Sequence, residues 1–190
     1  MRNNYDLQMQ AAARSFLTYD AREIAQRFAL NMDETALYLS VLHTPHRVRL
    51  DNAAVERRVG EDWEPAGFDT AMTVYDLLTN PNGRPVLAHE WCAHTSFHAV
   101  QGGTLSGTLM IHPEQSAQPF AGKLPLLRRA CACLGGEDAA EGGDFASVLP
   151  AFDCLPVLLR FWEADEEFPA QLQLLWDRNT CRYLRYETTF

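Results

Sequence analysis

The sequence predicts an α+β fold in which an antiparallel sheet with a C-terminal meander packs against several helices. In the last third of the chain, the apolar runs at 155–162 (LPVLLRFW) and 170–176 (AQLQLLW) are separated by only seven residues. A connection this short joins antiparallel strands. Helical patterns are also grouped with hairpin patterns and do not alternate regularly with strands, which is typical of α+β proteins.

The first part of the chain, residues 1–34, is predicted to be a helical segment. Residues 6–17 form one helix, and a second helix begins at Asp20. Asp20 is a good N-cap because Glu23 follows three residues later, which is the spacing of a capping box. A sheet-and-helix core at 35–190 is expected to follow this segment.

Three short strands are expected next. ALYLSVL at 36–42 is mostly apolar, whereas HRVRLD at 46–51 alternates apolar with charged residues. Such alternation is typical of a half-buried strand. Residues 43–45 (His-Thr-Pro) should separate these two strands, and residues 54–59 form the third.

The middle of the chain is predicted as a helix followed by extended segments. The helix covers 69–79, with Asp69 as its cap, and ends at Asn-Pro-Asn-Gly at 80–83, because Pro and Asn-Gly favour turns. Residues 84–91 should be extended, and residues 104–112 are a further strand.

The last third is predicted as a helix and then the meander. The helix covers 124–136 and ends with a glycine C-cap at Gly135 or Gly136. The meander consists of strands at 145–149, 155–162 and 170–176, a loop at 163–169, and a tight turn at 177–179 that leads into TCRYLRY.

Composition and charge limit the classes of function. Hydrophobic residues make up 47% and charged residues 22% of the 190 residues, as in ordinary globular proteins, and we expect one domain over residues 1–190. The net charge of −9 argues against a nucleic-acid partner, which requires clustered Lys and Arg.

The start of the chain, MRNNYDLQMQ, lacks the apolar run of a signal peptide. The longest apolar stretch, residues 155–162, contains Arg160 and is too short to span a membrane. We therefore expect a cytoplasmic protein with no membrane partner.

The five cysteines are predicted to be reduced thiols, because their number is odd and no secretion signal precedes them. Cys131 and Cys133 lie two positions apart on a predicted helix, so their side chains point about 200° apart and cannot hold one ion together. Both are interpreted as small buried hydrophobic residues.

Residues 89–98 (HEWCAHTSFH) hold three of the six histidines and resemble a zinc-protease motif. That motif places two histidines four apart on a helix, whereas His89 and His94 are five apart and would diverge by about 140°. On a strand, Cys92 and His94 share one face, and His98 could rejoin it as a third zinc or iron ligand. A Cys92–His94 nucleophile pair is a further alternative. A third interpretation is a half-buried strand with polar residues on its exposed face.

The loop at 163–169 is strongly acidic, with Glu163, Asp165, Glu166 and Glu167 between two apolar strands. Four interpretations are open: a hard-cation site, a docking surface for a basic partner, paired carboxylates for acid–base chemistry, or a solvated hairpin tip. Phe168 and Pro169 close the loop with an apolar residue and a rigid turn, which favours a fixed conformation. The candidate contact residues are Trp162, Glu163, Asp165, Glu166, Glu167 and Phe168.

Several of these segments together resemble domain of unknown function 3786, an uncharacterised family found mostly in anaerobic bacteria and archaea. The most specific similarity is the stretch from Trp162 to Pro169. Weaker similarity includes Leu134-Gly135-Gly136, Asp144-Phe145, Leu149-Pro150, Tyr183-Leu184, Glu187-Thr188, the helix at 20–27 and the segment from Tyr75 to Gly103. The resemblance implies no established activity. It implies that Trp91 and Phe97 are packing residues, which favours the half-buried strand over a metal site at 89–98. Some members carry a Cys-rich iron–sulfur module, but CxxC spacing is absent from this sequence, and we predict no cofactor.

Two functions follow as hypotheses. The first is a non-catalytic binding or accessory domain that contacts a protein or small molecule through the acidic loop and Trp162, since no complete catalytic constellation is present. The alternative is a metal-assisted enzyme of unknown reaction that uses Cys92, His94 and His98 or the acidic loop. A deep pocket with convergent polar groups favours the enzyme, and a shallow apolar patch rimmed by acids favours the binding domain.

Overall fold

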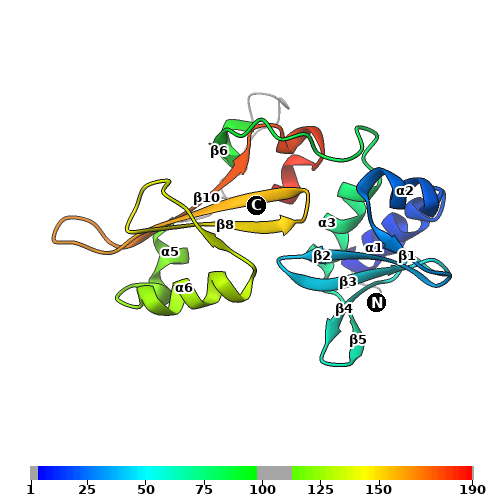
Figure 1. Ribbon diagram of the computed structural model, residues 1–190, viewed down its shortest axis with the longest axis horizontal. Helices are drawn as coiled ribbons and strands as arrows, with labels where there is room; N and C mark the ends of the chain where they lie inside the picture. The colour runs from blue at the N-terminus through cyan, green and yellow to red at the C-terminus, as the bar shows by residue number, and fades with distance from the viewer. Residues whose placement is uncertain (1–3, 98–112, 190) are drawn as a thin grey trace.

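The computed structural model describes residues 4–97 and 113–189, and these residues have the predicted α+β fold (Figure 1). The α-helices of the described residues are α1 (Asn4–Phe16), α2 (Ala21–Phe28), α3 (Phe68–Leu78), α5 (Pro113–Ala117) and α6 (Leu124–Cys133). None of these helices has the length and apolar character needed to cross a lipid bilayer.

The strands of the described residues form one antiparallel sheet. They are β1 (Asn31–Met32), β2 (Ala36–Val41), β3 (Thr44–Arg49), β4 (Val55–Val59), β5 (Asp62–Pro65), β6 (Trp91–Ala93), β7 (Glu137–Asp138), β8 (Phe145–Phe152), β9 (Leu155–Trp162) and β10 (Gln171–Asp177). Their order is β5-β4-β3-β2-β8-β9-β10-β6, with β1 beside β2 and β7 beside β8. Short 3-10 helices follow β6 and β10: η1 (His94–Phe97), η4 (Thr180–Arg182) and η5 (Tyr186–Thr189), while η3 (Gln118–Phe120) follows α5.

The sheet has two parts that meet at a narrow junction. In Figure 1, β1–β5 lie with α1–α3, and β8–β10 lie with α5 and α6. Within the described residues, β2 and β8 are in register only at Val41 and Phe152. The backbone N–H of Leu42 adds hydrogen bonds to the carbonyls of Pro150 (3.1 Å) and Ala151 (3.2 Å). The prediction of one domain over residues 1–190 stays a prediction.

The first hairpin differs from the prediction in its turn. Leu42 and His43 have φ values of 47° and 60°, so they form the turn themselves, and two adjacent positive φ values are typical of a tight hairpin turn. β3 therefore begins at Thr44, and Pro45 pairs with Ser40 of β2. The expectation that residues 43–45 separate the strands was wrong for Thr44 and Pro45.

Helix caps confirm two expectations and correct one. The carboxylate of Asp20 accepts a hydrogen bond from Arg22 N (2.8 Å), so Asp20 caps α2 as predicted. α6 ends at Cys133, and Gly135, just past its C-cap Leu134, has a φ of +76°. Gly136 N donates to Cys131 O (2.8 Å), as in a Schellman motif. Gly67, not Asp69, is the N-cap of α3. Asp69 lies in the first turn, where its negative charge interacts favourably with the positive end of the helix dipole.

α6 also separates its two cysteines, as expected from their spacing. Cys131 is buried, with 3% of its surface exposed. Cys133 is exposed, so the interpretation of Cys133 as a buried residue was wrong. The helix turns the two side chains to opposite sides, and only one side faces the sheet.

The C-terminal meander β8-β9-β10 is confirmed, but β8 extends past its predicted end. The strand was predicted to end at Leu149, yet β8 continues through Pro150 to Phe152. The β8–β9 register shifts between Leu149 and Phe152, and proline is tolerated at such an irregularity. β5 was not predicted, because its four residues are mostly polar. The strand predicted at 104–112 lies outside the described residues.

One face of the meander belongs to the main core, which also includes buried residues of α1, α2, α3, β2 and β3. Leu155, Val157, Leu159 and Phe161 alternate along β9 and join it, and Phe161 is completely buried. Leu158 points to the opposite face, where it packs in a smaller cluster with buried residues of β8 and β10. β9 is therefore covered on both faces, which explains its continuous apolar run.

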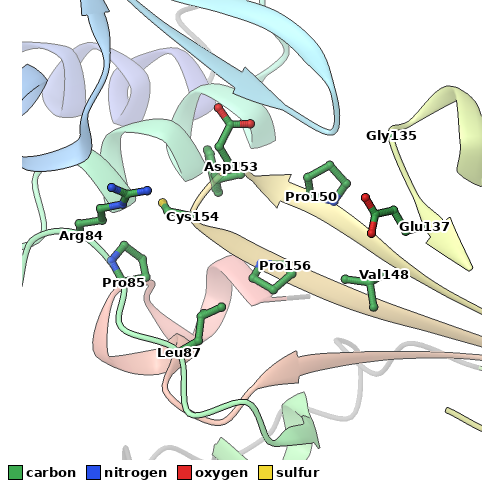
Figure 2. A pocket seen from close by; sticks show the side chains of 11 residues that line it. Arg84, Pro85, Leu87, Gly135, Glu137, Val148, Pro150, Asp153, Cys154 and Pro156 are labelled. Carbon is green, nitrogen blue, oxygen red and sulfur yellow. The ribbon is translucent and has the colours of Figure 1, made fainter. Parts of the chain in front are cut away.

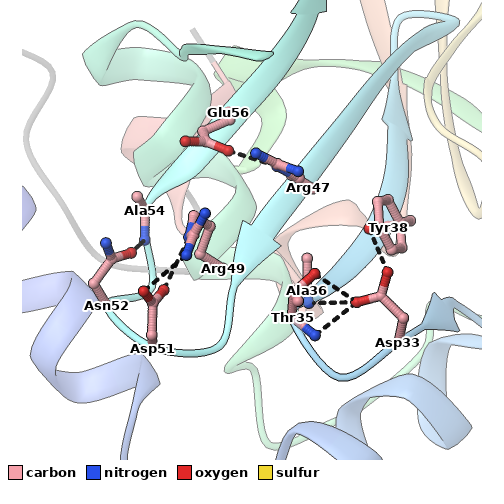
Figure 3. Close-up of polar contacts among 10 residues, drawn as sticks. All are labelled: Asp33, Thr35, Ala36, Tyr38, Arg47, Arg49, Asp51, Asn52, Ala54 and Glu56. Carbon is pink, nitrogen blue, oxygen red and sulfur yellow. Dashed lines mark hydrogen bonds and ion pairs between the residues drawn. The ribbon is translucent and has the colours of Figure 1, made fainter. Parts of the chain in front are cut away.

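A carboxylate organises the start of β2 (Figure 3). Asp33 Oδ1 accepts hydrogen bonds from Thr35 N (2.7 Å), Thr35 Oγ1 (2.7 Å) and Ala36 N (2.9 Å), and Asp33 Oδ2 accepts one from the Tyr38 hydroxyl (2.6 Å). The Tyr38 hydroxyl and then Thr35 hold the pKa of Asp33 well below its usual range. Asp33 therefore stays ionised and fixes the turn before β2.

Acid is expected to destabilise the protein through His46. This side chain is 5% exposed, its Nδ1 lies 2.8 Å from Thr44 O, and burial lowers its pKa below the ordinary 6.5, with a smaller contribution from Arg57. As the pH falls below 6.5, the unfolded chain takes up a proton at His46 before the folded chain does. The free energy of unfolding is therefore highest above pH 6.5. It falls as the pH is lowered from 6.5 to and through the pKa that His46 has in the folded chain.

Urea unfolding at pH 7.5, 6.5, 5.5 and 5.0 measures this effect. A His46→Gln variant, which keeps a donor for Thr44 O, should lose less stability over this range than the wild-type chain. The same pH dependence in both proteins would contradict the assignment to His46.

Candidate functional site

The acidic loop at 163–169 leaves the sheet between β9 and β10. Pairing of these strands ends at Trp162 and Gln171, and the loop extends beyond the end of the sheet in Figure 1. Most of its side chains are exposed, including Phe168, which has 61% of its surface exposed. The loop therefore presents its charged and aromatic groups to the surroundings.

Asp165 gives the loop a defined conformation. Its Oδ1 accepts hydrogen bonds from Phe168 N (2.7 Å) and Glu167 N (2.8 Å), and its own N donates to Phe168 O (3.0 Å). The bond from Phe168 N and then that from Glu167 N lower the pKa of Asp165, so the carboxylate stays charged. The sequence had assigned this rigidity to Phe168 and Pro169, whereas Asp165 provides the hydrogen bonds.

The base of the loop is held by residues distant in sequence. Asp144 Oδ2 accepts a hydrogen bond from Glu163 N (2.8 Å), and Glu163 Oε2 accepts one from Gly122 N (2.8 Å). Gly143, just before Asp144, has a φ of +78°, and a Cβ there would lie 2.6 Å from Phe161 O. Only glycine allows this close approach, which places Asp144 beside the loop.

These residues enclose a pocket of about 520 Å³, which we call the hairpin pocket. It is lined by Asp144, Trp162, Glu163, Ala164, Asp165, Phe168, Pro169 and Gln171. Four of the six predicted contact residues belong to this lining, and Glu166 and Glu167 lie outside it, nearer the tip. Sequence reasoning missed Asp144 and Gln171, although Asp144 follows a Gly-Gly pair that signals an unusual backbone.

The hairpin pocket is negatively charged. None of the described residues that line it is Lys or Arg. Within residues 4–97 and 113–189, no ion pair involves Asp144 or any carboxylate of the loop. The nearby Arg160 pairs with Glu141 (3.6 Å). Asp144 and the carboxylates of the loop are therefore not paired with a basic side chain of the described residues.

The Cys92–His94–His98 segment does not continue as the expected strand. β6 ends at Ala93, and His94 begins η1, so strand alternation no longer places Cys92 and His94 on one face. Phe97 is 3% exposed and Trp91 packs in the smaller cluster, as expected of packing residues.

The chemistry of this segment gives little support to a reactive or metal-binding thiol. Burial, and then Asp177, raise the pKa of Cys92, whereas a nucleophile or thiolate ligand needs a lowered pKa. Burial lowers the pKa of His94. His98 lies outside the described residues, and among those described no group of three or more His, Cys, Asp or Glu side chains is arranged so that it could hold a metal ion. The metal hypothesis for Cys92, His94 and His98 stays a hypothesis.

Comparisons with known proteins find one relationship. The model of the family described as domain of unknown function (DUF3786) matches residues 20–190. No curated protein and no solved structure matches the chain. The match covers the sheet, the hairpin pocket and α2, so the predicted resemblance is confirmed over most of the chain.

Proposed function

The chain belongs to the DUF3786 family, a domain of unknown function, and from this premise we propose that it is a non-catalytic binding domain that docks a basic segment of a partner protein. The contact surface consists of the hairpin pocket, whose lining includes Phe168, together with Glu166 and Glu167 outside it. The observation that carries the proposal is a preorganised pocket with an aromatic wall and acidic lining groups, whose described lining residues include no Lys or Arg.

Charge determines which kind of partner fits. The carboxylates of Asp144, Glu163 and Asp165 line one pocket, and each already accepts a backbone hydrogen bond that fixes its position. A guanidinium forms short, strong hydrogen bonds to such carboxylates, and it also stacks well on an indole such as that of Trp162. An arginine-containing segment therefore matches both kinds of lining group.

The size of the surface favours a protein segment over a small cation. Phe168 is 61% exposed, and Glu166 and Glu167 continue the acidic surface beyond the pocket lining. A small molecule within the pocket would leave these groups uncovered. A partner segment with arginine and aliphatic side chains would cover Phe168 and meet the tip carboxylates as well.

Fluorescence anisotropy with a labelled, N-acetylated and C-amidated peptide of alternating Arg and Leu tests the proposal on the full chain. The Glu166→Gln/Glu167→Gln double variant removes two charges from side chains that make no hydrogen bond or ion pair in the described chain. We expect it to bind the peptide about fivefold more weakly at low salt, because rim charges contribute modestly to affinity.

A Glu23→Gln/Glu34→Gln double variant is the matched control, since it makes the same charge change at exposed residues far from the hairpin in sequence. It should bind like the wild-type chain. Equal losses in the two double variants would show that the peptide responds only to net charge, and that result would overturn the hairpin pocket as the docking site.

A further inference from the structure

A second pocket, of about 460 Å³, lies at the junction of the two parts of the sheet, and we call it the bridge pocket (Figure 2). Its walls come from the segment after α3, the residues after α6 and the β8–β9 hairpin. Its volume is within the range of about 300–1,000 Å³ that is usual for small-molecule sites. None of its lining residues is shared with the hairpin pocket.

The bridge pocket combines an apolar lining with charged groups at separate places. Arg84 and Glu137 stand at opposite sides of it, with Pro150 and Pro156 between them (Figure 2). Within the described part of the chain, the side chains of Arg84, Glu137 and Asp153 form no hydrogen bond or ion pair. These charges are thus available to a ligand.

We propose that the bridge pocket binds a small zwitterion with an apolar body, of the amino-acid or short-peptide class, with its carboxylate on Arg84 and its ammonium group on Glu137. A guanidinium matches a carboxylate in geometry and charge, and Glu137 supplies the opposite charge across the pocket. The proline rings and Leu87 provide a rigid apolar surface for the body of the ligand.

The total charge of the lining argues against a phosphate-bearing ligand. The described lining residues include one cationic side chain, Arg84, and two carboxylates, Glu137 and Asp153. The net charge of the lining is therefore negative and would repel a multiply charged anion. The Cys154 thiol is neutral at physiological pH, because burial raises its pKa to about 11. It is therefore part of the lining and does not react with the ligand.

Titration of the ¹⁵N-labelled full chain with leucyl-leucine, followed by ¹H–¹⁵N NMR, tests this inference. We expect saturable shifts of the backbone amides of residues 84, 86–88 and 153–155, since Pro85 and Pro156 have no N–H. Leucyl-leucine amide and N-acetyl-leucyl-leucine, which lack the carboxylate and the ammonium charge respectively, should each bind about tenfold more weakly, the size of one charge-assisted hydrogen-bonding contact.

Variants assign each charge of the ligand to its residue. Arg84→Gln should remove the preference for the free acid over the amide, and Glu137→Gln should remove the preference for the free amine over the acetylated form. Arg129→Gln, at an exposed arginine of α6, is the control and should preserve both preferences. No saturable binding of leucyl-leucine, equal binding of the blocked forms, or equal effects of Arg84→Gln and Arg129→Gln would overturn the inference.

The Glu166→Gln/Glu167→Gln variant separates this inference from the proposed function. It should bind leucyl-leucine like the wild-type chain. A loss of leucyl-leucine binding in that variant would place the ligand at the hairpin pocket and would overturn the assignment to the bridge pocket.

Discussion

Replacing Asp177 by alanine is expected to lower the free energy of unfolding by about 3–5 kcal/mol. The side chain is 2% exposed. Its Oδ1 accepts hydrogen bonds from Ala88 N (3.0 Å) and Asn179 N (2.9 Å), and its Oδ2 accepts one from His89 N (2.8 Å). Alanine leaves these backbone donors without their acceptor, and the segment after α3 loses an attachment to β10.

Urea unfolding measures this loss. Asp177→Asn should have an intermediate effect, because an amide retains one acceptor oxygen but places a donor group where the second oxygen was. Asp62→Ala, at an exposed aspartate of β5, should change stability by less than about 0.5 kcal/mol. An Asp177→Ala variant as stable as Asp62→Ala would show that water replaces the carboxylate at no net cost.

The elements that the sequence predicted correctly are those with a strong local pattern. β9 and β10 were predicted within one residue, because an apolar run between turn residues specifies a buried strand without reference to the rest of the fold. The Asp20 cap and the glycine end of α6 were also local signals. Patterns of this kind need only a few neighbouring residues.

The errors arose where tertiary contacts override local preference. Pro150 reads as the end of a strand, but an irregularity in the β8–β9 register lets β8 continue to Phe152. β5 has almost no apolar signal, and it is stabilised by pairing with β4 and by Trp63, whose ring lies 4.5 Å from the Arg47 guanidinium carbon. A contact between residues this far apart cannot be predicted from a short window of sequence.

The same distinction applies to the candidate sites. The acidic loop was evident as a charge run, but its anchors Asp144 and Gly122 lie 19 and 41 residues from Glu163. The bridge pocket was not predicted, because Arg84, Glu137 and Cys154 come from three separate segments. Charge runs can be found from sequence, whereas pockets depend on which segments the sheet brings together.

Substitution of the two phenylalanines of the β9–β10 hairpin is expected to affect different properties: Phe161 the stability of the fold, and Phe168 the binding of the peptide. Phe161 is fully buried and Phe168 is 61% exposed. Phe161→Ala is expected to lower the free energy of unfolding by about 3–5 kcal/mol, because it removes a large side chain from the core and leaves a cavity. Phe168→Ala should change stability by less than about 0.5 kcal/mol.

The affinity for the labelled Arg-Leu peptide should fall more in Phe168→Ala than in Phe161→Ala, the reverse of the effects on stability. Phe168→Ala removes the aromatic group that the proposed partner segment covers, so its affinity should fall by about fivefold, equivalent to roughly 1 kcal/mol. Phe161→Ala, measured at a temperature where the variant is still folded, should retain most of its affinity, because the Phe161 side chain is buried in the main core and is not part of the pocket lining. Unchanged affinity in Phe168→Ala would contradict docking at the loop, since the exposed ring would then serve neither the fold nor the partner.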